Sequence, residues 1–339
     1  MYRYPYNAAS ERGKAVVKCR VCRGHAVVEV RRHNAGFCRE HFLRHCRQQV
    51  RRAVDDHEMI GAGERVLVAV SGGKDSLALW DLLVELGFSA DGLYLGLGID
   101  DYSDASGAYA RSYASERALT LYEVDLGPDV GFTVPEAAAA TRRAPCGACG
   151  LSKRHLFNAV VRERGYDVVA TGHNLDDEAA VLLGNVLRWD VEYLRRQQPV
   201  LPAAPGFVRK IKPLYRLGER EMAAYCVLRG IDYQVEECPM APGNRHLGYK
   251  ETLDALELRS PGSKAVFLFG FLDRARELLA ATADAPRDQL GRCVVCGSPT
   301  GVEPRPGDTE VVCAFCRLQT QATAARVMMD PVRSRAARA

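Results

Sequence analysis

Residues 66–80 read VLVAVSGGKDSLALW, an apolar run followed by a glycine pair among polar side chains. The apolar run predicts a buried strand, and the residues after the glycines have helical spacing. A tight turn between a parallel strand and a helix presents backbone N–H groups and the positive end of the helix dipole to an anion. The stretch therefore predicts a phosphate site whose glycines admit the backbone and whose side chains add donors: Ser71, Gly72, Gly73, Lys74 and Ser76.

This turn differs from a Walker loop. Asp75 follows Lys74 where the Walker pattern has Ser or Thr, and Val68 stands at the first glycine position. A carboxylate beside phosphates would repel them unless it binds Mg²⁺ or holds a neighbouring donor. The alternative interpretation is a glycine pair that only turns the chain.

The fold class follows from the alternation of short β-rich runs with helical patterns. The expected strands are 65–70, 92–98, 119–126, 166–172 and 231–237. Strands that alternate with helices predict an α/β fold with a doubly wound parallel sheet. We divide the chain into 1–50, a cysteine module and the start of a linking helix; 51–240, the α/β domain; 241–285, a helical segment; 286–325, a second cysteine module; and 326–339, a basic tail.

Composition narrows the class of protein. The 339 residues are 47% hydrophobic with a formal net charge of +4, which permits a nucleic-acid partner without requiring one. No signal-peptide core is visible at the start, and the longest apolar run, 265–272, is far shorter than the about 20 residues of a membrane span. We therefore expect a cytoplasmic protein with no membrane partner. Since thiols stay reduced there, its 12 cysteines indicate metal sites rather than disulfides.

Each end of the chain carries a set of ligands at zinc spacing. The first is Cys19, Cys22 and Cys38 with either His41 or His45, and the second is Cys293, Cys296, Cys313 and Cys316. Such closed sets predict structural Zn²⁺, which folds modules too small to bury a core. Arginines near the first module form either a solvated face or an RNA clamp: Arg31, Arg32, Arg44, Arg47, Arg51 and Arg52.

Three central cysteines form a different kind of group. Cys146 and Cys149 precede a helical pattern, so we expect both at a helix amino terminus, where the dipole favours thiolate. Cys238 is proposed as the third member, just beyond the last expected strand. Three thiolates are one short of a closed zinc or iron–sulfur set, and the plainer alternative is a redox or structural thiol pair. Cys46 and Cys226 are expected to be buried core residues.

A second strand and turn, VVATGHNLDDEA, follows at 168–179. Its Asp177 could hold Mg²⁺ or move a proton, or could simply stabilise a helix start; Asp176 and Glu178 are less favoured for the chemistry. We expect His173 to be a hydrogen-bonded turn residue rather than a base. Lys153, one helical turn beyond Cys149, could reach the same cavity, although a lone lysine is usually solvated.

The loop SGGKDS resembles the pyrophosphate-binding PP-loop of the ATP pyrophosphatases. With PCGACGLSKRHL, VVATGHNLDDEA, EECP and CAFCRL, in this order from about Cys19 to Arg317, the chain resembles the tRNA 2-thiouridine synthetases. Within them it is most similar to the tRNA-5-methyluridine(54) 2-sulfurtransferases. The family pattern around FCREHF favours His41 over His45.

The resemblance implies a specific reaction and its cofactors. ATP with Mg²⁺ adenylates the C2 oxygen of 5-methyluridine 54 in the tRNA T-loop. Sulfur then replaces that oxygen, and AMP and pyrophosphate are released. A [4Fe-4S] cluster on Cys146, Cys149 and Cys238 would leave one iron open for sulfide, beside two structural Zn²⁺. A thiocarboxylated ubiquitin-like carrier protein would deliver the sulfur, and the enzyme would be a homodimer.

The resemblance also assigns roles to individual positions. Asp75, Lys153 and Asp177 would be catalytic beside the three cysteines. The nucleotide would contact Ala69, Ser71, Gly72, Gly73, Lys74, Asp75, Ser76, Leu95, Lys153, Gly172 and Asp177.

Three alternatives stay open at this point. The target could be the wobble uridine 34, because wobble thiolases share these motifs. The chain could be a non-catalytic zinc and iron–sulfur protein that binds RNA, although the intact loop argues against it. Cys146 and Cys238 could also act as a persulfide pair without iron.

Overall fold

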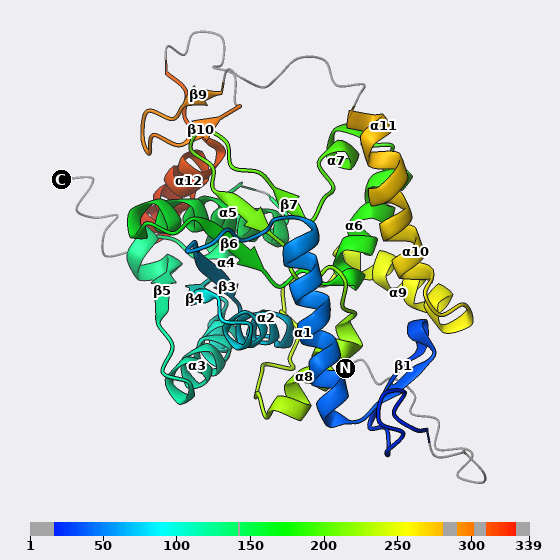
Figure 1. Cartoon of the computed structure of the whole chain (residues 1–339). Helices are drawn as coiled ribbons and strands as arrows, with labels where there is room; N and C mark the ends of the chain where they lie inside the picture. The colour runs from blue at the N-terminus through cyan, green and yellow to red at the C-terminus, as the bar shows by residue number, and fades with distance from the viewer. Residues whose placement is uncertain (1–16, 142, 281–289, 302–309, 330–339) are drawn as a thin grey trace, which may run out of the picture.

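The computed structural model describes residues 17–141, 143–280, 290–301 and 310–329. Its centre is a six-stranded sheet in the order β5-β4-β3-β6-β8-β7 (Figure 1). The strands are β3 (Arg65–Val70), β4 (Ser89–Gly96), β5 (Leu121–Asp125), β6 (Val168–Thr171), β7 (Val200–Leu201) and β8 (Arg209–Ile211). All neighbours pair in parallel except β7 with β8. The strand order reverses between β3 and β6, and a ligand crevice forms at such a switch point.

Helices cover both faces of the sheet, which confirms the doubly wound fold. The residues of β3 alternate between two cores: Val66, Val68 and Val70 face one, and Leu67 faces the other. The helices between the strands are α2 (Lys74–Glu85), α3 (Asp100–Glu116), the π-helical turn η2 (Leu126–Val130), α4 (Val134–Thr141), α5 (Pro145–Arg164), α6 (Leu175–Arg188) and α7 (Val191–Arg195). Helix α8 (Glu219–Arg229) follows β8.

One expected strand is wrong. Residues 231–237 are irregular, and β8 fills the last parallel position of the sheet. The backbone N–H of Gln234 donates to Gly72 O at 3.0 Å, so this segment runs against the glycine loop instead of joining the ladder. Because β8 has three residues and β7 has two, neither gives a periodic signal in the sequence. Cys238 therefore follows a loop, not a strand.

The ends of the expected strand 92–98 also shift. The strand β4 spans Ser89–Gly96, so Leu97 and Gly98 lie outside it. Gly98 has φ +65°, which ends the extended backbone, and Leu97 O accepts from Val134 N instead.

The first cysteine module comprises β1 (Val28–Val30), the short 3₁₀ turn η1 (Arg31–His33) and β2 (Ala35–Phe37), followed by helix α1 (Arg39–Asp56). It docks on α8, because the Arg39 guanidinium donates to Leu228 O at 2.8 Å and Arg32 pairs with Glu221 at 2.7 Å. Figure 1 shows α1 in blue beside one end of α2 and extending towards the sheet.

The rest of the chain is mainly helical. Helices α9 (Arg245–Arg259), α10 (Ser263–Gly270), the π-helical turn η3 (Phe271–Ala275) and α11 (Arg276–Ala280) pack beside α6 and α7 (Figure 1). The second cysteine module has β9 (Gly291–Arg292), β10 (Pro299–Thr300) and α12 (Ala314–Met329). Helix α12 continues through Met329, so the first part of the expected tail is helical, and residues 330–339 lie outside the described part. Among the described helices, none is long and apolar enough to span a membrane.

Candidate active site

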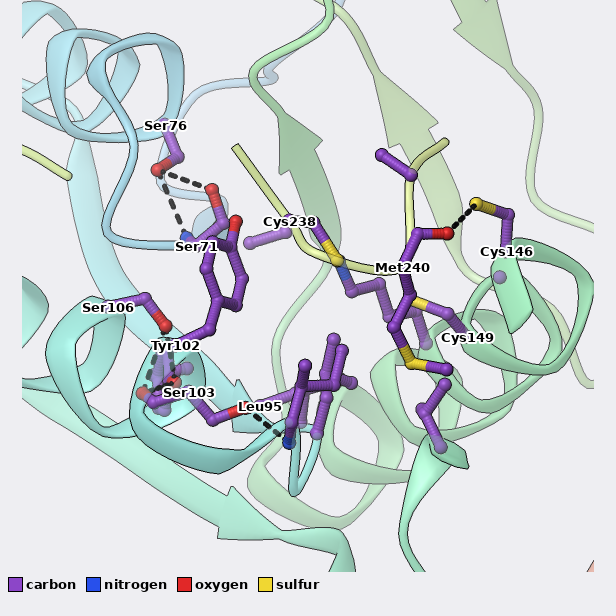
Figure 2. A pocket seen from close by; sticks show the side chains of 18 of the residues that line it. Ser71, Ser76, Leu95, Tyr102, Ser103, Ser106, Cys146, Cys149, Cys238 and Met240 are labelled. Atoms are coloured by element: carbon purple, nitrogen blue, oxygen red, sulfur yellow. Dashed lines mark hydrogen bonds between the residues drawn. The ribbon is translucent and has the colours of Figure 1, made fainter. Parts of the chain in front are cut away.

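A cavity of about 620 Å³ opens at the carboxyl ends of β3, β4 and β6. Ten of the residues expected to carry the chemistry line it: Ala69, Ser71, Asp75, Ser76, Leu95, Cys146, Cys149, Lys153, Gly172 and Cys238. Figure 2 shows Ser71 and Ser76 on one side and the three cysteines on the other. The cavity therefore joins the glycine loop to the cysteine group.

The glycine loop is closed by its own hydrogen bonds. Ser71 N donates to Ser76 Oγ at 3.0 Å, and that hydroxyl donates to Gly73 O at 2.9 Å. Gly72 has φ +73°, and a Cβ there would lie 2.2 Å from Ser106 O. A Cβ on Gly172 would lie 2.9 Å from Ser76 N, so the turn after β6 packs directly on the loop. Both glycines are needed for this close approach of backbone to backbone.

Lys74 points to carboxylates rather than into the cavity. Its Nζ lies 3.1 Å from Asp75 and 2.8 Å from Glu219. Burial opposes the charged ammonium, but the two carboxylates outweigh it and raise the pKa of Lys74. Neither Lys74 nor its neighbours Gly72 and Gly73 are among the lining residues, so their contact with a phosphate stays a prediction.

Asp75 lies at the centre of the polar side of the site. Burial raises the pKa of its carboxyl to about 6, with Lys74 opposing and Asp177 reinforcing the shift. The side chain of Asn174 donates to Asp75 Oδ1 at 3.0 Å. Asn174 also caps α6 through a reciprocal pair with Asp177, each side chain accepting from the other's backbone N–H at 3.1 Å. Asp177 itself does not line the cavity, and Lys250 binds its other oxygen at 2.5 Å.

Two of the three central cysteines lie where α5 begins, and Cys238 lies in the segment between α8 and α9. Cys146 and Cys149 are the second and fifth residues of α5, near its amino terminus as expected. The helix dipole does not give Cys146 a lowered pKa, however. Burial and the neighbouring thiols Cys149 and Cys238 raise its pKa instead. Asn244, the N-cap of α9, donates its side-chain N–H to Cys146 Sγ at 3.8 Å.

Lys153 and His173 both line this cavity. His173 shares a 2.8 Å hydrogen bond with Thr171, and burial lowers its pKa. It is thus the hydrogen-bonded turn residue that the sequence suggests, although it faces the site.

Four residues at the site were not expected from the sequence. They are Asn174, Glu219, Asn244 and Lys250. The pattern Asn-x-x-Asp at the start of α6 could have indicated Asn174 as a cap. No local spacing indicates the other three, because their partners are distant in the sequence.

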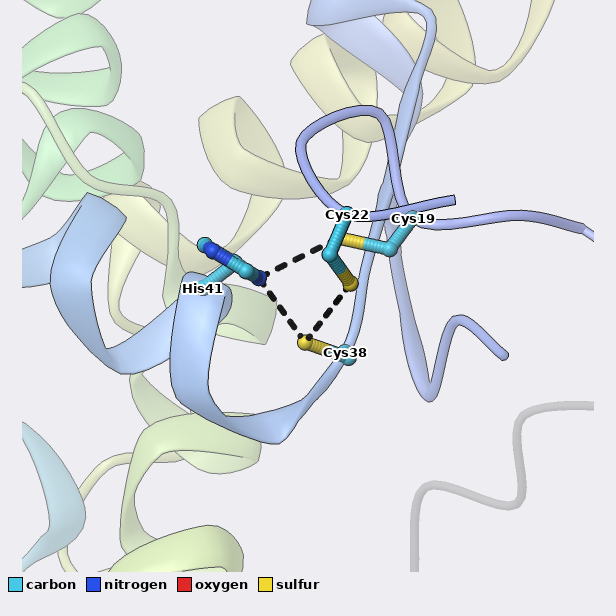
Figure 3. A group of neighbouring side chains, drawn as sticks. All are labelled: Cys19, Cys22, Cys38 and His41. Atoms are coloured by element: carbon cyan, nitrogen blue, oxygen red, sulfur yellow. Dashed lines mark hydrogen bonds between the residues drawn. The ribbon is translucent and has the colours of Figure 1, made fainter. Parts of the chain in front are cut away.

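The terminal ligand sets have tetrahedral spacing. In the first, Nδ1 of His41 lies 3.6 Å from Cys19 Sγ and 3.1 Å from Cys38 Sγ, while Cys22 and Cys38 are 3.9 Å apart (Figure 3). A Zn–S bond of about 2.3 Å gives sulfurs about 3.8 Å apart around a tetrahedral Zn²⁺. The set fits that ion. His45 is not part of it, because its Nε2 lies 3.3 Å from Glu221.

The second set is more enclosed. Cys293, Cys313 and Cys316 are buried and Cys296 is partly exposed. Cys296 and Cys313 have sulfurs 3.8 Å apart, and the N–H of Cys313 donates to Cys293 Sγ at 3.2 Å. Burial alone would raise the pKa of Cys293, but such backbone donors outweigh it and lower the pKa to about 6. A low pKa favours the thiolate that binds Zn²⁺.

The basic residues of the first module are largely occupied. Arg44 pairs with Glu40, Arg47 with Glu85 and Arg52 with Asp56, and Arg51 donates to Leu86 O. Arg32 is buried against Glu221. Arg32 is therefore not available to RNA, whereas Arg44 and Arg52 stay exposed in surface pairs.

A glycine loop after the first strand of a doubly wound sheet, opening into a crevice where strand order reverses, defines an α/β protein of the PP-loop type. Residues 18–43 match the family model "2-thiouridine synthetase TtuA, N-terminal LIM domain". The chain is 50% identical over 300 residues to the tRNA-5-methyluridine(54) 2-sulfurtransferase of Thermus thermophilus, covering 88% of this chain and 90% of the relative. The Pyrococcus horikoshii protein of that name is 37% identical, covering 89% and 93%.

A solved structure has the same fold. The U34-tRNA thiolase NcsA from Methanococcus maripaludis, with its [4Fe-4S] cluster, superposes with a TM-score of 0.74 at 25% identity, covering 91% of this chain and 97% of that one. This chain belongs to the family of the tRNA-5-methyluridine(54) 2-sulfurtransferases.

Proposed function

We propose that this chain replaces the C2 oxygen of 5-methyluridine 54 in tRNA by sulfur, using ATP and releasing AMP and pyrophosphate. The observation that carries the proposal is one cavity lined both by the glycine loop, through Ser71 and Ser76, and by Cys146, Cys149 and Cys238. The residues that would bind ATP and those that would supply sulfur thus line the same cavity. A reaction that first activates a base and then exchanges its oxygen for sulfur requires both groups close to that base.

In the first step the uracil O2 attacks the α-phosphorus of ATP, and pyrophosphate leaves. Ser71, Ser76 and the amides at the start of α2 would bind phosphate oxygens, with Lys74 supplying positive charge behind them. Lys153, on the cysteine side of the same cavity, would contact the nucleotide. Asp75, which lines the cavity, would hold Mg²⁺ or act as a catalytic acid. Asp177, held by Asn174 N and Lys250, would act through its charge on Asp75. The backbone at Ala69, Leu95 and Gly172 would border the nucleotide. Sulfide then attacks C2, and AMP leaves with the original oxygen.

The central cysteines suit a multinuclear centre better than a single ion. Among the described residues, the groups whose ligand atoms all lie within 4.8 Å of one another are the two terminal sets, and the central three are not such a group. Three thiolates that line one cavity without all lying within 4.8 Å of one another fit a [4Fe-4S] cluster with one iron left open. When bound there, it would supply a Lewis-acidic iron that keeps sulfide deprotonated near neutral pH. Cys146, Cys149 and Cys238 would hold it, and Asn244 would orient Cys146 by its hydrogen bond.

Two kinds of partner follow from the proposal. tRNA is the substrate, and a thiocarboxylated ubiquitin-like carrier protein is the proposed sulfur source. We also propose two structural Zn²⁺ in the terminal sets and a cytoplasmic homodimer.

The choice of position 54 over 34 rests on sequence identity, since the relatives named for position 54 are 50%, 37% and 38% identical, against 25% for the U34 thiolase.

The first experiment is anaerobic purification followed by measurement of iron, sulfide and zinc. We expect about four irons and two zincs per chain. Cys238→Ala should lose the iron and keep the zinc, while Cys226→Ala, a buried thiol outside the cavity, should keep both. Zinc alone with full activity would instead favour a persulfide on Cys146 and Cys238.

The second experiment incubates the anaerobic protein with ATP, Mg²⁺, sulfide and tRNA and maps 2-thiouridine by mass spectrometry of nuclease fragments. Thiolation in the T-loop is the expected result. Thiolation in the anticodon arm would transfer the proposal to wobble uridine 34. RNA binding without pyrophosphate release or thiolation would mean a non-catalytic RNA-binding protein.

A further inference from the structure

Helix α9 reaches the cavity at its start and contacts the acidic first turns of α6 and α8 further along. At its start, Asn244 donates to Cys146 Sγ at 3.8 Å. Lys250, less than two turns further on, lies 2.5 Å from Asp177 and 3.3 Å from Glu219. We propose that Lys250 is a positioning residue for the reaction, holding α9 against the acidic ends of α6 and α8 so that the cysteines and the glycine loop keep their relative geometry. This inference rests on the proposed function.

Lys250 is one of three lysines that form ion pairs with the acidic residues in the first turn of α6. Lys264 binds Asp176, Lys250 binds Asp177 and Lys212 binds Glu178. Two of these lysines come from the helical segment after residue 240, so that segment is fixed to the start of α6 by charge. Packing adds to this, since a Cβ on Gly184 would lie 2.6 Å from the Tyr249 ring. The helix α9 is therefore held at a defined distance from α6.

Lys250 differs from Lys264 in pairing directly with the Glu219 carboxylate, whose other oxygen binds Lys74 of the glycine loop. Glu219 bridges two lysines, with Oε1 2.8 Å from Lys74 and Oε2 3.3 Å from Lys250. Lys74 in turn lies 3.1 Å from Asp75, which lines the cavity. The order Asp177, Lys250, Glu219, Lys74, Asp75 alternates in charge from α6 to the loop. Removing Lys250 leaves two adjacent carboxylates without their shared cation.

Asp177 shows the positioning most directly. Its Oδ2 accepts from Asn174 N at 3.1 Å and its Oδ1 is bound by Lys250, so both oxygens are fixed by this chain. Burial opposes the charge on Lys250, but Asp177 and Glu219 outweigh it and raise its pKa, so the ammonium is present at neutral pH. A shorter neutral side chain would release one oxygen of Asp177 and one of Glu219 together.

The test compares Lys250→Met with Lys250→Arg in cluster-loaded protein, measuring pyrophosphate release from ATP in the presence of tRNA. Lys250→Met should lower kcat about 10- to 100-fold with little change in the KM for ATP, because a misplacement of about 1 Å has this effect on a positioned reaction. Lys250→Arg, which keeps the charge, should recover most of the rate. Arg259→Met removes an exposed cation from the far end of α9 and should match the wild type.

The outcomes separate the two proposals. A wild-type protein that releases no pyrophosphate contradicts the proposed function. An active wild type with Lys250→Met equal to Arg259→Met overturns the role of Lys250, as does a loss of rate that Lys250→Arg does not restore. Iron content is measured on every variant, so that loss of the cluster is not mistaken for loss of positioning. If Lys250→Met does not fold, Lys250→Gln is measured in its place; it removes the charge that Asp177 and Glu219 share and should also lower kcat.

Discussion

The imidazole of His155 stacks on the ring of Phe315, with centroids 3.9 Å apart and planes 9° from parallel. Phe315 lies between two cysteines of the second module, and His155 lies on α5, the helix that starts with Cys146 and Cys149. The Gln319 side chain adds a 2.8 Å bond to Val130 O. The C-terminal module is therefore part of the wall behind the cysteine side of the cavity.

Phe315→Ala should destabilise the protein by about 3–5 kcal/mol, the range for removing a buried aromatic ring. Denaturant unfolding followed by circular dichroism measures the change. Val295→Ala is the matched control: it lies in the same module but is 67% exposed, so its effect should stay within about 0.5 kcal/mol. Equal effects of the two variants would mean that the ring does not support α5.

The buried pair Arg32–Glu221 fixes the first module to α8. Both side chains are 8% exposed, and Glu221 also accepts from Gly218 N at 2.8 Å. Arg32→Met leaves a buried carboxylate with less compensation and should cost about 3–5 kcal/mol. Arg44→Met removes an arginine from an exposed surface pair and should cost at most about 1 kcal/mol. A small effect of Arg32→Met on the unfolding midpoint would show that the module is held by its apolar contacts instead.

Gly72→Ala should raise the KM for ATP at least about tenfold, because the new methyl group would displace the loop from Ser106 O. Gly87 provides a control with a similar backbone, since its φ is +83° and a Cβ there meets nothing within 4 Å. Gly87→Ala should lower stability by about 1 kcal/mol through left-handed strain and leave ATP use unchanged. If both variants change the KM equally, strain rather than crowding explains the effect.

Glu219 predicts a dependence of stability on pH. Burial alone would raise its pKa, but Lys250 and Lys74 lower it to about 2, from an ordinary value of 4.5. A carboxyl with a lowered folded pKa stabilises the protein above its unfolded pKa and loses that contribution as pH falls through the folded value. Unfolding midpoints should therefore drop between pH 4.5 and about 2. Glu219→Gln should flatten this part of the profile, whereas Glu40→Gln, on the surface, should leave its slope unchanged.

The Zn²⁺ ions that we propose for the two terminal ligand sets should be released at different rates. Cys22 is exposed in the first set, whereas three of the four ligands of the second are buried. A chelator with a colorimetric zinc reporter should show one fast and one slow phase of about one zinc each. Cys22→Ser should abolish the fast phase only. A single phase would show that the two sites are equally accessible.

The sequence by itself determined those features of the protein that depend on residues close together in the chain. The glycine loop, the two terminal ligand sets and the start of α5 at Cys146 depend on residues a few positions apart, or on pairs at fixed spacing. Their geometry is set by the turn or helix that contains them. For the same reason strands β3, β5 and β6 were predicted near their observed bounds.

Tertiary structure decided which distant residues meet. Residues 231–237 have strand-like composition but form no strand, because Gln234 bonds to the glycine loop and the short β8 occupies the sheet. Lys250 and Glu219 approach the site from separate helices, and no periodicity in the sequence predicts the ion pair between them. Charge pairing and packing across long chain separations depend on the whole fold, since each contact exists only once the sheet has placed both helices.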